Sequence, residues 1–491
     1  MASPLLISAN TETECLVIGG GLGGLACAAL AAKQGWQVSL FEKNPALGGK
    51  LGTYEKAGFS WDTGPSLITM PEVLEEIWTV FGACFPYELV RLPSTCRYQW
   101  EDGTVIHEDV EFWQRPECTK FLKHAAGLWE VSEGPFLRHD IRDLAGWKSL
   151  PGFGSLRHLP KLMSLQSLSD FLKRFFPEQH LHQLFCRFAT YNGSSPYRTP
   201  AAFAIIPYVQ AAFGGWYVRG GLYQIVEGLK ELALSVGVQI HTGTEVTKVA
   251  PSGEGFEVVL ADGTRRYAAK VVCNMDVLSA YHSIFPEVER ERFFTRKVRH
   301  TDVSLSGMVL LLGLRGTTEG LEHHNIFFSR DYRSEFEALS AGELAERPTI
   351  YVAIDSKTEP ERAPEGHENW FVLVNAPDCR TGQVDWDSVK ESYADTVLSQ
   401  LENDFGLKGL RDRVVVRELI SPADFEQRHR SWGGSLYGFA SHGLDSAFTR
   451  PPLASKSMPG LYFVGGTTHP GGGIPLVLRS AMMVARRLGD I

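Results

Sequence analysis

The sequence of 491 residues contains no uninterrupted run of about 18 apolar residues, which is the length that a membrane-spanning helix needs. The first 14 residues hold no Lys or Arg and no long apolar core, so we expect no signal peptide. The chain also shows no internal repeat and no low-complexity segment, which excludes repeat proteins. These absences favour a globular protein of the cytoplasm.

Paired cysteines and an excess of positive charge are missing as well. The eight cysteines are scattered and none forms a C-x-x-C motif, so we interpret them as reduced core thiols of a cytosolic protein. We assign no metal ligands. The net charge of −9 argues against a nucleic-acid partner. The length is sufficient for roughly two to four domain-sized units.

A strand, a glycine-rich turn, an alanine-rich helix and a second strand follow one another over residues 14–42. The turn has the G-x-G-x-x-G spacing, with glycines at Gly19, Gly21 and Gly24. The first glycine allows the tight turn, the second lets a pyrophosphate approach the backbone, and the third lets helix and strand pack closely. Glu42 ends the second strand, where a carboxylate accepts hydrogen bonds from a ribose. This order of features predicts a dinucleotide site at the N-terminus of the helix.

Two further glycine-rich segments extend this prediction. Gly48-Gly49-Lys50 would place amide groups and a cation beside the phosphates, although a solvent-exposed turn has the same composition. Near the C-terminus, an apolar strand leads into the segment THPGGGIP and then into a helix that we expect to begin near Pro475. The amides and dipole of that junction would hold another part of the same cofactor. Two junctions at opposite ends of the chain predict one large cofactor between them.

Three segments in the middle of the chain allow two interpretations each. Residues 201–213 are apolar almost throughout, which suits either the lining of a cavity or a buried core segment. Residues 167–176 form an amphipathic pattern, either a membrane-surface helix or a helix that packs its Phe residues on the core, and we favour the core. The five cations in residues 290–300 indicate a solvated face or a contact with anionic lipid.

The remaining patterns predict strands and helices. Residues 111–190 look mainly helical, and Asp102-Gly103 predicts a hairpin between flanking strands. Alternating segments predict a three-stranded meander and then a second sheet. The meander strands are residues 244–249, 256–260 and 264–272, and the second sheet includes residues 303–314, 349–355, 369–375 and 413–419.

Several stretches together resemble the bacterial-type phytoene desaturases of carotenoid biosynthesis, and the resemblance runs from about residue 13 to residue 488. Its most specific part is THPGGGIP. The stretches DTGPSLITM and ATYNGSSPYRTPA are most similar to those of hydroxyneurosporene and methoxyneurosporene desaturases, which introduce the C-3,4 double bond. The stretches that carry the resemblance are residues 19–42, 48–50, 61–73, 192–201 and 463–475.

The resemblance implies an α/β fold with a Rossmann-like FAD-binding domain of the glutathione-reductase or amine-oxidase type and an inserted α+β substrate domain. It also implies non-covalent FAD and hydride transfer from an allylic C–H of a linear C30–C50 polyene to flavin N5. The polyene would come from a membrane surface, and a quinone or oxygen would accept the electrons. We expect a cytoplasmic protein that associates peripherally with membranes. The implied FAD-binding domain comprises residues 1–92, 215–290 and 425–491, and the substrate domain comprises residues 93–214 and 291–424.

The resemblance also implies a set of cofactor-binding residues. Lys50 stands where the family often has Arg, which weakens a bidentate phosphate contact. No carboxylate near residues 152–157 matches a proposed acid or base of relatives, so we assign no catalytic residue. The implied cofactor-binding residues are Gly19, Gly21, Gly24, Glu42, Lys43, Gly49, Lys50, Gly64, Val246, Gly466, His469, Gly472, Ile474 and Pro475.

Other functions remain open for a chain of this kind. A flavin-dependent carotene cis–trans isomerase, a saturase and an oxygenase belong to the same family. Prenyl-binding escort proteins, such as the Rab GDP dissociation inhibitors, share the fold without FAD, and the intact glycines with Glu42 argue against that role. A soluble amine oxidase would need two aromatic residues that cage the amine, and the sequence does not identify them.

Overall fold

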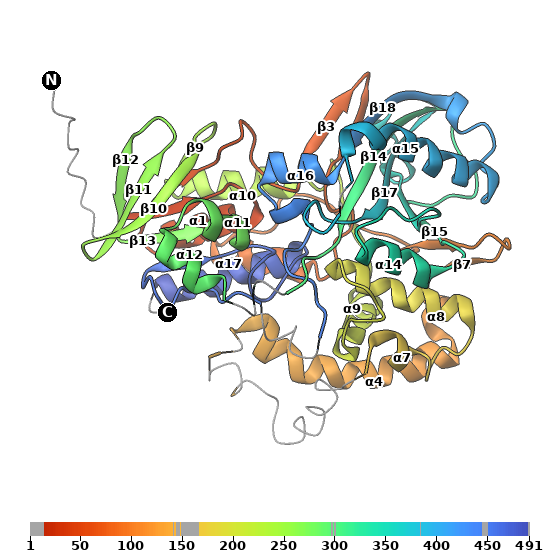
Figure 1. Ribbon diagram of the computed structural model, residues 1–491, viewed down its shortest axis with the longest axis horizontal. Helices are drawn as coiled ribbons and strands as arrows, with labels where there is room; N and C mark the ends of the chain where they lie inside the picture. The colour runs from red at the N-terminus through yellow and green to blue at the C-terminus, as the bar shows by residue number, and fades with distance from the viewer. Residues whose placement is uncertain are drawn as a thin grey trace.

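The computed structural model describes residues 14–140, 142, 143, 148, 166–295, 298, 301–382, 384–443 and 450–489. Figure 1 shows a parallel sheet with its helices on the left and a larger sheet on the right. A layer of helices lies below the larger sheet in this view (Figure 1). The region around residues 152–157, where a catalytic carboxylate was sought, lies outside the described residues. The limits of the two domains stay a prediction.

The parallel sheet is assembled from three separate regions of the chain. All of its neighbouring strands pair in parallel, and the first strand of the chain lies at the centre. Cys15, Leu16 and Val17 are fully buried because helices and strands cover both faces of the sheet. The strand order is β19 (Leu461–Phe463), β13 (Lys270–Cys273), β1 (Glu14–Ile18), β2 (Gln37–Phe41) and β9 (Gln239–His241).

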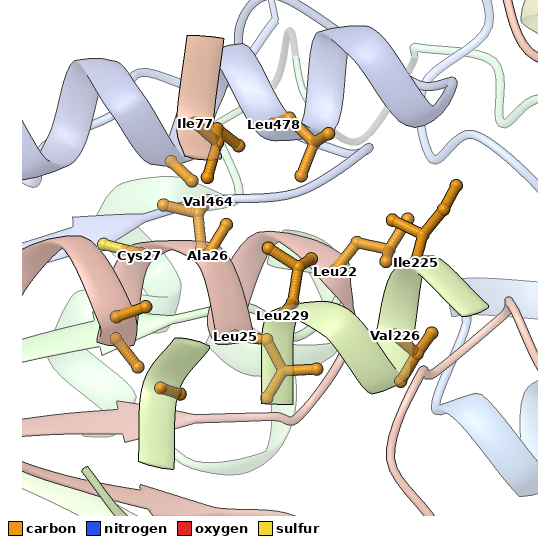
Figure 2. Close-up of a cluster of buried hydrophobic side chains, with 14 of the residues drawn as sticks. Leu22, Leu25, Ala26, Cys27, Ile77, Ile225, Val226, Leu229, Val464 and Leu478 are labelled. Carbon is orange, nitrogen blue, oxygen red and sulfur yellow. The ribbon is translucent and has the colours of Figure 1, made fainter. Parts of the chain in front are cut away.

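Helix α1 (Leu22–Lys33) is the most enclosed helix of this half. Its side chains are apolar and mostly small on every side. The helix is therefore buried all round, and other helices approach it closely. Figure 2 shows Leu22, Leu25 and Ala26 of this helix, with Leu478 on one side and Leu229 packed among them. The helices around it are α10 (Gln224–Ser235), α17 (Ile474–Leu488) and α2 (Glu72–Val80).

The predicted meander differs from the structure in its last strand. Its strands are β10 (Val246–Ser252), β11 (Gly255–Leu260) and β12 (Arg265–Ala268). The prediction of one strand over residues 264–272 is wrong, because the chain leaves the meander at Ala269 and enters the parallel sheet as β13. The reason lies in the sequence: Arg265, Arg266 and Tyr267 are exposed, whereas Val271 and Val272 are fully buried.

The larger sheet has seven strands. One of its faces belongs to a hydrophobic core, and the other lines a cavity. One face packs on α15 (Trp386–Asn403), and along β17 that face carries Trp370, Val372 and Val374. The predicted hairpin and the predicted strands of the second sheet are confirmed within a few residues. The strand order is β18 (Val414–Ile420), β14 (Ser306–Arg315), β17 (His367–Ala376), β16 (Ile350–Ala353), β15 (His324–Phe327), β6 (Arg97–Gln99) and β7 (Val105–His107).

The helical layer below this sheet shows which of the two interpretations of residues 167–176 is correct. The segment at residues 167–176 contains the five-residue helix α7 (Leu168–Leu172), and Leu168, Leu172 and Phe176 are fully buried. The core interpretation is therefore confirmed, and a membrane-surface helix at this segment is wrong. The other elements of the layer are α3 (Val110–Gln114), α4 (Pro116–Ser132), a π-helical turn (Glu133–Arg138), α8 (Gln179–Cys186), 3-10 turns (Arg187–Asn192 and Ala201–Ala204), α9 (Ile205–Phe213) and α14 (Tyr332–Ser340).

The basic segment at residues 290–300 begins in α12 (Glu287–Phe293). Within it, Arg290 pairs with Glu287 at 2.8 Å and Arg292 pairs with Glu289 at 2.6 Å, which is typical of a solvated helix face. Across the described ranges, no helix combines the length and apolarity that crossing a bilayer requires. The remaining short elements are β3 (Thr53–Lys56), β4 (Phe59–Asp62), β5 (Leu89–Arg91), β8 (Trp216–Val218), α11 (Val277–Ser283), α16 (Pro422–His429) and 3-10 turns (Asp355–Lys357, Pro360–Arg362, Arg411–Arg413 and Trp432–Gly434).

Candidate active site

One cavity of about 590 Å³ connects the glycine-rich turn of β1 with the larger sheet. At one end its wall includes Gly19, Glu42 and Val246, and at the other end it includes Ile326 and Leu373. The floor of the cavity is the face of the larger sheet opposite α15. This cavity floor is formed by Val309, Tyr351, Phe371, Leu373 and Asn375.

The first glycine turn has the geometry that the spacing predicts. Gly19 adopts φ +96°, which a residue with a side chain rarely adopts. A Cβ atom on Gly24 would lie 2.0 Å from the Gly19 carbonyl oxygen, so helix and strand pack at a distance that only glycine permits. Gly24 therefore supports the turn from behind and does not line the cavity.

Glu42 has a structural role beside its predicted contact with a ribose. The Gly20 amide donates to Glu42 Oε2 at 2.8 Å, and the Asn44 amide donates to Oε1 at 2.8 Å. The carboxylate lies on the cavity wall and keeps further lone pairs for a ligand hydroxyl. The second function of this acid, fixing the glycine turn, was not predicted from the sequence.

The Gly48-Gly49-Lys50 segment lies inside the protein. The Gly48 amide donates to the Gly20 carbonyl at 2.8 Å, so the alternative of a solvent-exposed turn is wrong. Lys50 Nζ donates to the carbonyls of Ser435 and Leu436 at 3.0 and 2.8 Å. Burial in the cavity wall lowers the pKa of Lys50 to about 8, and nearby Asp276 offsets part of this shift.

The C-terminal glycine junction meets the cavity at Gly472, Gly473 and Ile474. Gly473 has φ +98° and open space where a side chain would lie, and α17 begins at the next residue, as predicted. Arg450 supports this junction from within the protein. Its guanidinium donates to the Gly466 carbonyl at 3.1 Å and occupies the space that a side chain on Gly471 would need. Burial lowers the pKa of Arg450 to about 10. No sequence signal pointed to this arginine.

His469 lies away from the cavity lining, and its predicted contact with the cofactor stays a prediction. Its side chain is buried, but Nε2 donates to the His139 carbonyl at 3.0 Å and the residue does not line the cavity. The cause is the following glycine turn, which directs Gly472 and Ile474 into the cavity and leaves His469 behind the wall. The other predicted cofactor residues, apart from Gly24, all line the cavity: Gly19, Gly21, Glu42, Lys43, Gly49, Lys50, Gly64, Val246, Gly466, Gly472, Ile474 and Pro475.

The half of the cavity away from the glycine turns is largely apolar. Ile205, Ile206 and Val209 of the segment at residues 201–213 line it, so the interpretation of this segment as a cavity lining is confirmed. They face the cavity floor, whose side chains Val309, Phe371 and Leu373 are apolar as well. This chamber suits a long hydrocarbon and excludes water.

A buried polar network borders this apolar chamber, and sequence reasoning missed it. Arg187 Nη2 donates to Tyr98 Oη at 2.8 Å, and Tyr98 donates to Glu108 Oε2 at 2.5 Å. Gln210 Nε2 donates to the other oxygen of Glu108 at 2.6 Å, and Tyr191 Oη donates to Gln210 Oε1 at 2.6 Å. Burial raises the pKa of Glu108, and Arg187 offsets part of the shift.

A second polar group crosses the cavity floor. Tyr351 Oη lies 2.8 Å from His324 Nδ1 and 2.5 Å from Ser66 Oγ. Burial, His323 and Arg187 together hold the pKa of His324 well below its usual value, so the imidazole is neutral at pH 7. Both side chains are therefore uncharged at pH 7, and the pair places no charge in the apolar chamber.

Comparison with known proteins agrees with this geometry. The model of the flavin-containing amine oxidoreductase family matches residues 22–489. Cyclohexylamine oxidase from Brevibacterium oxydans IH-35A has a similar fold, with a TM-score of 0.62 and 15% identity over 98% of this chain and 99% of that chain. The predicted fold class is confirmed, and the chain belongs to this family of flavoproteins.

Relatives with named activities narrow the assignment. The 1-hydroxycarotenoid 3,4-desaturase of Flavobacterium sp. (strain P99-3) is 34% identical over 486 residues, covering 96% of this chain and 98% of the relative. The 4,4'-diapolycopene oxygenase of Methylomonas sp is 32% identical, covering 98% of this chain and 99% of the relative. Within the flavoprotein family, this chain belongs with the bacterial carotenoid desaturases, as the sequence motifs predicted, and its cofactor is FAD.

The residues near the glycine turns fit FAD. Asp276 Oδ2, Ser431 Oγ and His429 Nδ1 belong to cavity-lining residues and are buried without a hydrogen-bond partner in the protein. Buried polar atoms of this kind need a partner, and the hydroxyl groups and phosphates of FAD would supply it. A Cβ on Gly21 would lie 2.8 Å from Asn274 Nδ2, so the backbone there stays bare for a close approach by the cofactor.

Proposed function

We propose that this chain is an FAD-dependent desaturase of a linear C30–C50 carotenoid. The observation that carries the proposal is the single cavity that joins the glycine turns to an apolar chamber above the cavity floor. Both desaturases and oxygenases of carotenoids occur among the relatives, and the sequence motifs favour desaturation.

We propose that the predicted cofactor residues on the cavity wall hold FAD. Gly19 and Gly21 leave room for the pyrophosphate, and Glu42 accepts from a ribose hydroxyl. Lys50 supplies a positive charge, and the N-terminus of α17 supplies a helix dipole beside the flavin. When bound, FAD supplies the two-electron redox chemistry that a desaturation needs.

The chain's own residues orient the substrate and keep charge and water away from it. Phe371 and Leu373 on the cavity floor and Ile206 opposite them hold a polyene by apolar contact and keep water out. Tyr351 and neutral His324 place no charge beside the polyene, and the low pKa of His324 makes its imidazole a poor proton acceptor, so we assign no catalytic base. These assignments use no charged base in the apolar chamber.

We also propose peripheral association with a membrane and a quinone or oxygen as electron acceptor. The support is chemical, because a linear carotenoid is insoluble in water and has to be taken from a bilayer. The segment at residues 167–176 does not supply the contact, since its apolar side chains are buried. Co-sedimentation of the purified protein with liposomes tests the association, and a protein that stays in the supernatant contradicts it.

Product analysis tests the reaction. The FAD-loaded protein is incubated with a linear carotene in liposomes, and products are separated and identified by mass and absorption spectrum. Desaturation removes two hydrogen atoms per new double bond and shifts absorption to longer wavelength. Unchanged mass with an altered spectrum would indicate an isomerase, added hydrogen a saturase and added oxygen an oxygenase. Each of these results overturns the proposed reaction.

A further inference from the structure

Apart from Tyr351, whose hydroxyl is paired with His324 and Ser66, the cavity floor is apolar except at one end. Along β17 the floor-facing positions are Phe371, Leu373 and Asn375, so the third position breaks the apolar pattern. On one side of Asn375, the strand register places Gly307 of β14 directly opposite. On the other side, Ile350 pairs with Val374, so the residue before Ile350, Thr349, lies next to Asn375. One row across the floor is therefore polar, while the adjacent rows carry mainly apolar side chains.

The side chain of Asn375 is held in one orientation. Its Nδ2 donates to Glu335 Oε1 at 3.5 Å. Glu335 is only 2% exposed, and its Oε2 is fixed by the Thr349 hydroxyl at 2.7 Å and by the Ser329 hydroxyl at 2.9 Å. The carboxylate thus binds the amide nitrogen of Asn375 and leaves the amide oxygen toward the cavity. Among the described residues, none donates to Asn375 Oδ1.

A second polar group without a partner lies beside this row. Tyr332 precedes Glu335 by one turn of α14 and lines the cavity, and its hydroxyl is buried without a hydrogen-bond partner. An acceptor on Asn375 and an unpaired hydroxyl on Tyr332 are a poor surface for a pure hydrocarbon. They are a suitable surface for a group that both donates and accepts hydrogen bonds.

The polar row lies close to the C-terminal glycine junction. Ser306, next to Gly307 on β14, donates from Oγ to the Gly434 carbonyl at 2.6 Å. The segment that follows, residues 435–437, supplies two carbonyls to Lys50 and packs the Tyr437 ring against Gly472. The polar row is therefore one residue along β14 from the position that contacts Gly434, which precedes the segment at residues 435–437.

We propose that Asn375, oriented by Glu335 and flanked by Tyr332, binds a hydroxyl group at the end of the carotenoid substrate. The hydroxyl donates to Asn375 Oδ1, and Tyr332 completes the subsite when its side chain adjusts by a small rotation. The bond that is oxidised then lies near the hydroxylated end of the polyene. This inference rests on the proposed function, and it adds the end group of the substrate and the residues that select it.

The experiment compares two substrates in the FAD-loaded protein: a 1-hydroxycarotenoid and the carotene of the same length without the hydroxyl. The wild type is expected to prefer the hydroxylated substrate in kcat/KM. Asn375→Leu, of similar volume, is expected to reduce that preference about tenfold, because one buried hydrogen bond is lost. Val415→Leu, at an exposed position of β18 in the same sheet and away from the cavity, is the control and is expected to leave the preference unchanged.

Tyr332→Phe gives an independent result, because the hydroxyl that it removes has no partner and its loss leaves the fold intact. It is expected to reduce the preference as well. An unchanged preference in both variants, or no preference in the wild type, overturns the subsite and leaves the desaturase assignment standing. If the wild type desaturates neither substrate, the proposed function fails. Quenching of tryptophan fluorescence by the same two carotenoids then decides the subsite alone: equal affinities in wild type and Asn375→Leu overturn it.

Discussion

The Cβ position of Gly472 lies 2.5 Å from Cδ1 of Tyr437, closer than real side chains approach one another. The same aromatic ring lies 2.9 Å from the Cβ position of Gly193, in the helical layer. Tyr437 is therefore wedged between two glycines that are far apart in the sequence. The C-terminal glycine junction, the segment at residues 435–437 and the helical layer form one packing unit at the cofactor end of the cavity.

The first prediction concerns this contact. Gly472→Val is expected to abolish desaturation and weaken FAD binding, because the new side chain collides with Tyr437 and narrows the cavity. Far-UV circular dichroism is expected to stay nearly unchanged. The double variant Gly472→Ala with Tyr437→Leu, which relieves the collision, is expected to recover FAD binding relative to Gly472→Ala. Full activity with an unaltered flavin potential in Gly472→Val would remove this junction from the site.

The second prediction concerns Glu42. Glu42→Ala is expected to weaken FAD binding by about 1–3 kcal/mol, since the ribose contact and the anchor of the Gly20 amide are lost together. Titration of the apoprotein with FAD, followed by flavin fluorescence, measures the dissociation constant. Glu42→Gln keeps an acceptor and is expected to fall between wild type and Glu42→Ala. Equal FAD affinity in all three proteins would count against the ribose assignment.

The third prediction uses the pKa of Lys50, which is about 8 without FAD. FAD phosphates favour the charged amine, so wild-type affinity for FAD is expected to fall as pH rises from 7 to about 9 and the free protein loses this charge. Lys50→Arg keeps the charge over this range. Its affinity is expected to be nearly independent of pH. A parallel decline in both proteins would place the titrating group elsewhere.

The fourth prediction concerns acid stability. The folded-state pKa of His324 lies well below the usual 6.5, so the unfolded chain binds a proton there at a pH where the folded chain does not. Its contribution to the free energy of unfolding is complete above pH 6.5. It is lost as pH falls, by about 1 kcal/mol per pH unit, until the folded pKa is reached. Urea denaturation at several pH values measures the slope, which is expected to be smaller in His324→Gln. Identical slopes would contradict a neutral, buried imidazole.

The features that could be predicted from the sequence are those with local causes. The spacing of Gly19, Gly21 and Gly24 dictates a turn within six residues, and the structure shows the contacts that this spacing demands. The start of α17 at the C-terminal junction follows from Pro475 in the same way. The polar network of the substrate half was not predictable, because Glu108 and Arg187 meet only through the tertiary fold.

The errors have similar physical origins. A single strand over residues 264–272 was expected because every residue suits an extended chain, yet burial divides the segment at Ala269 between two sheets. The predicted cofactor contact of His469 stays a prediction, although its Nε2 donates to the His139 carbonyl instead of pointing into the cavity. Arg450 and Asn375 carry no motif, and only the cavity geometry distinguishes them from other polar residues.

The parallel sheet has a consequence for synthesis of the protein on the ribosome. Its edge strand, Leu461–Phe463, and the helix Ile474–Leu488 that covers α1 come from the last part of the chain, whereas its central strand comes from the first. The side of α1 that faces α17 is therefore left uncovered until nearly the end of translation. Because the start of that helix also lines the cofactor cavity, the complete FAD site exists only after the final helix has been made.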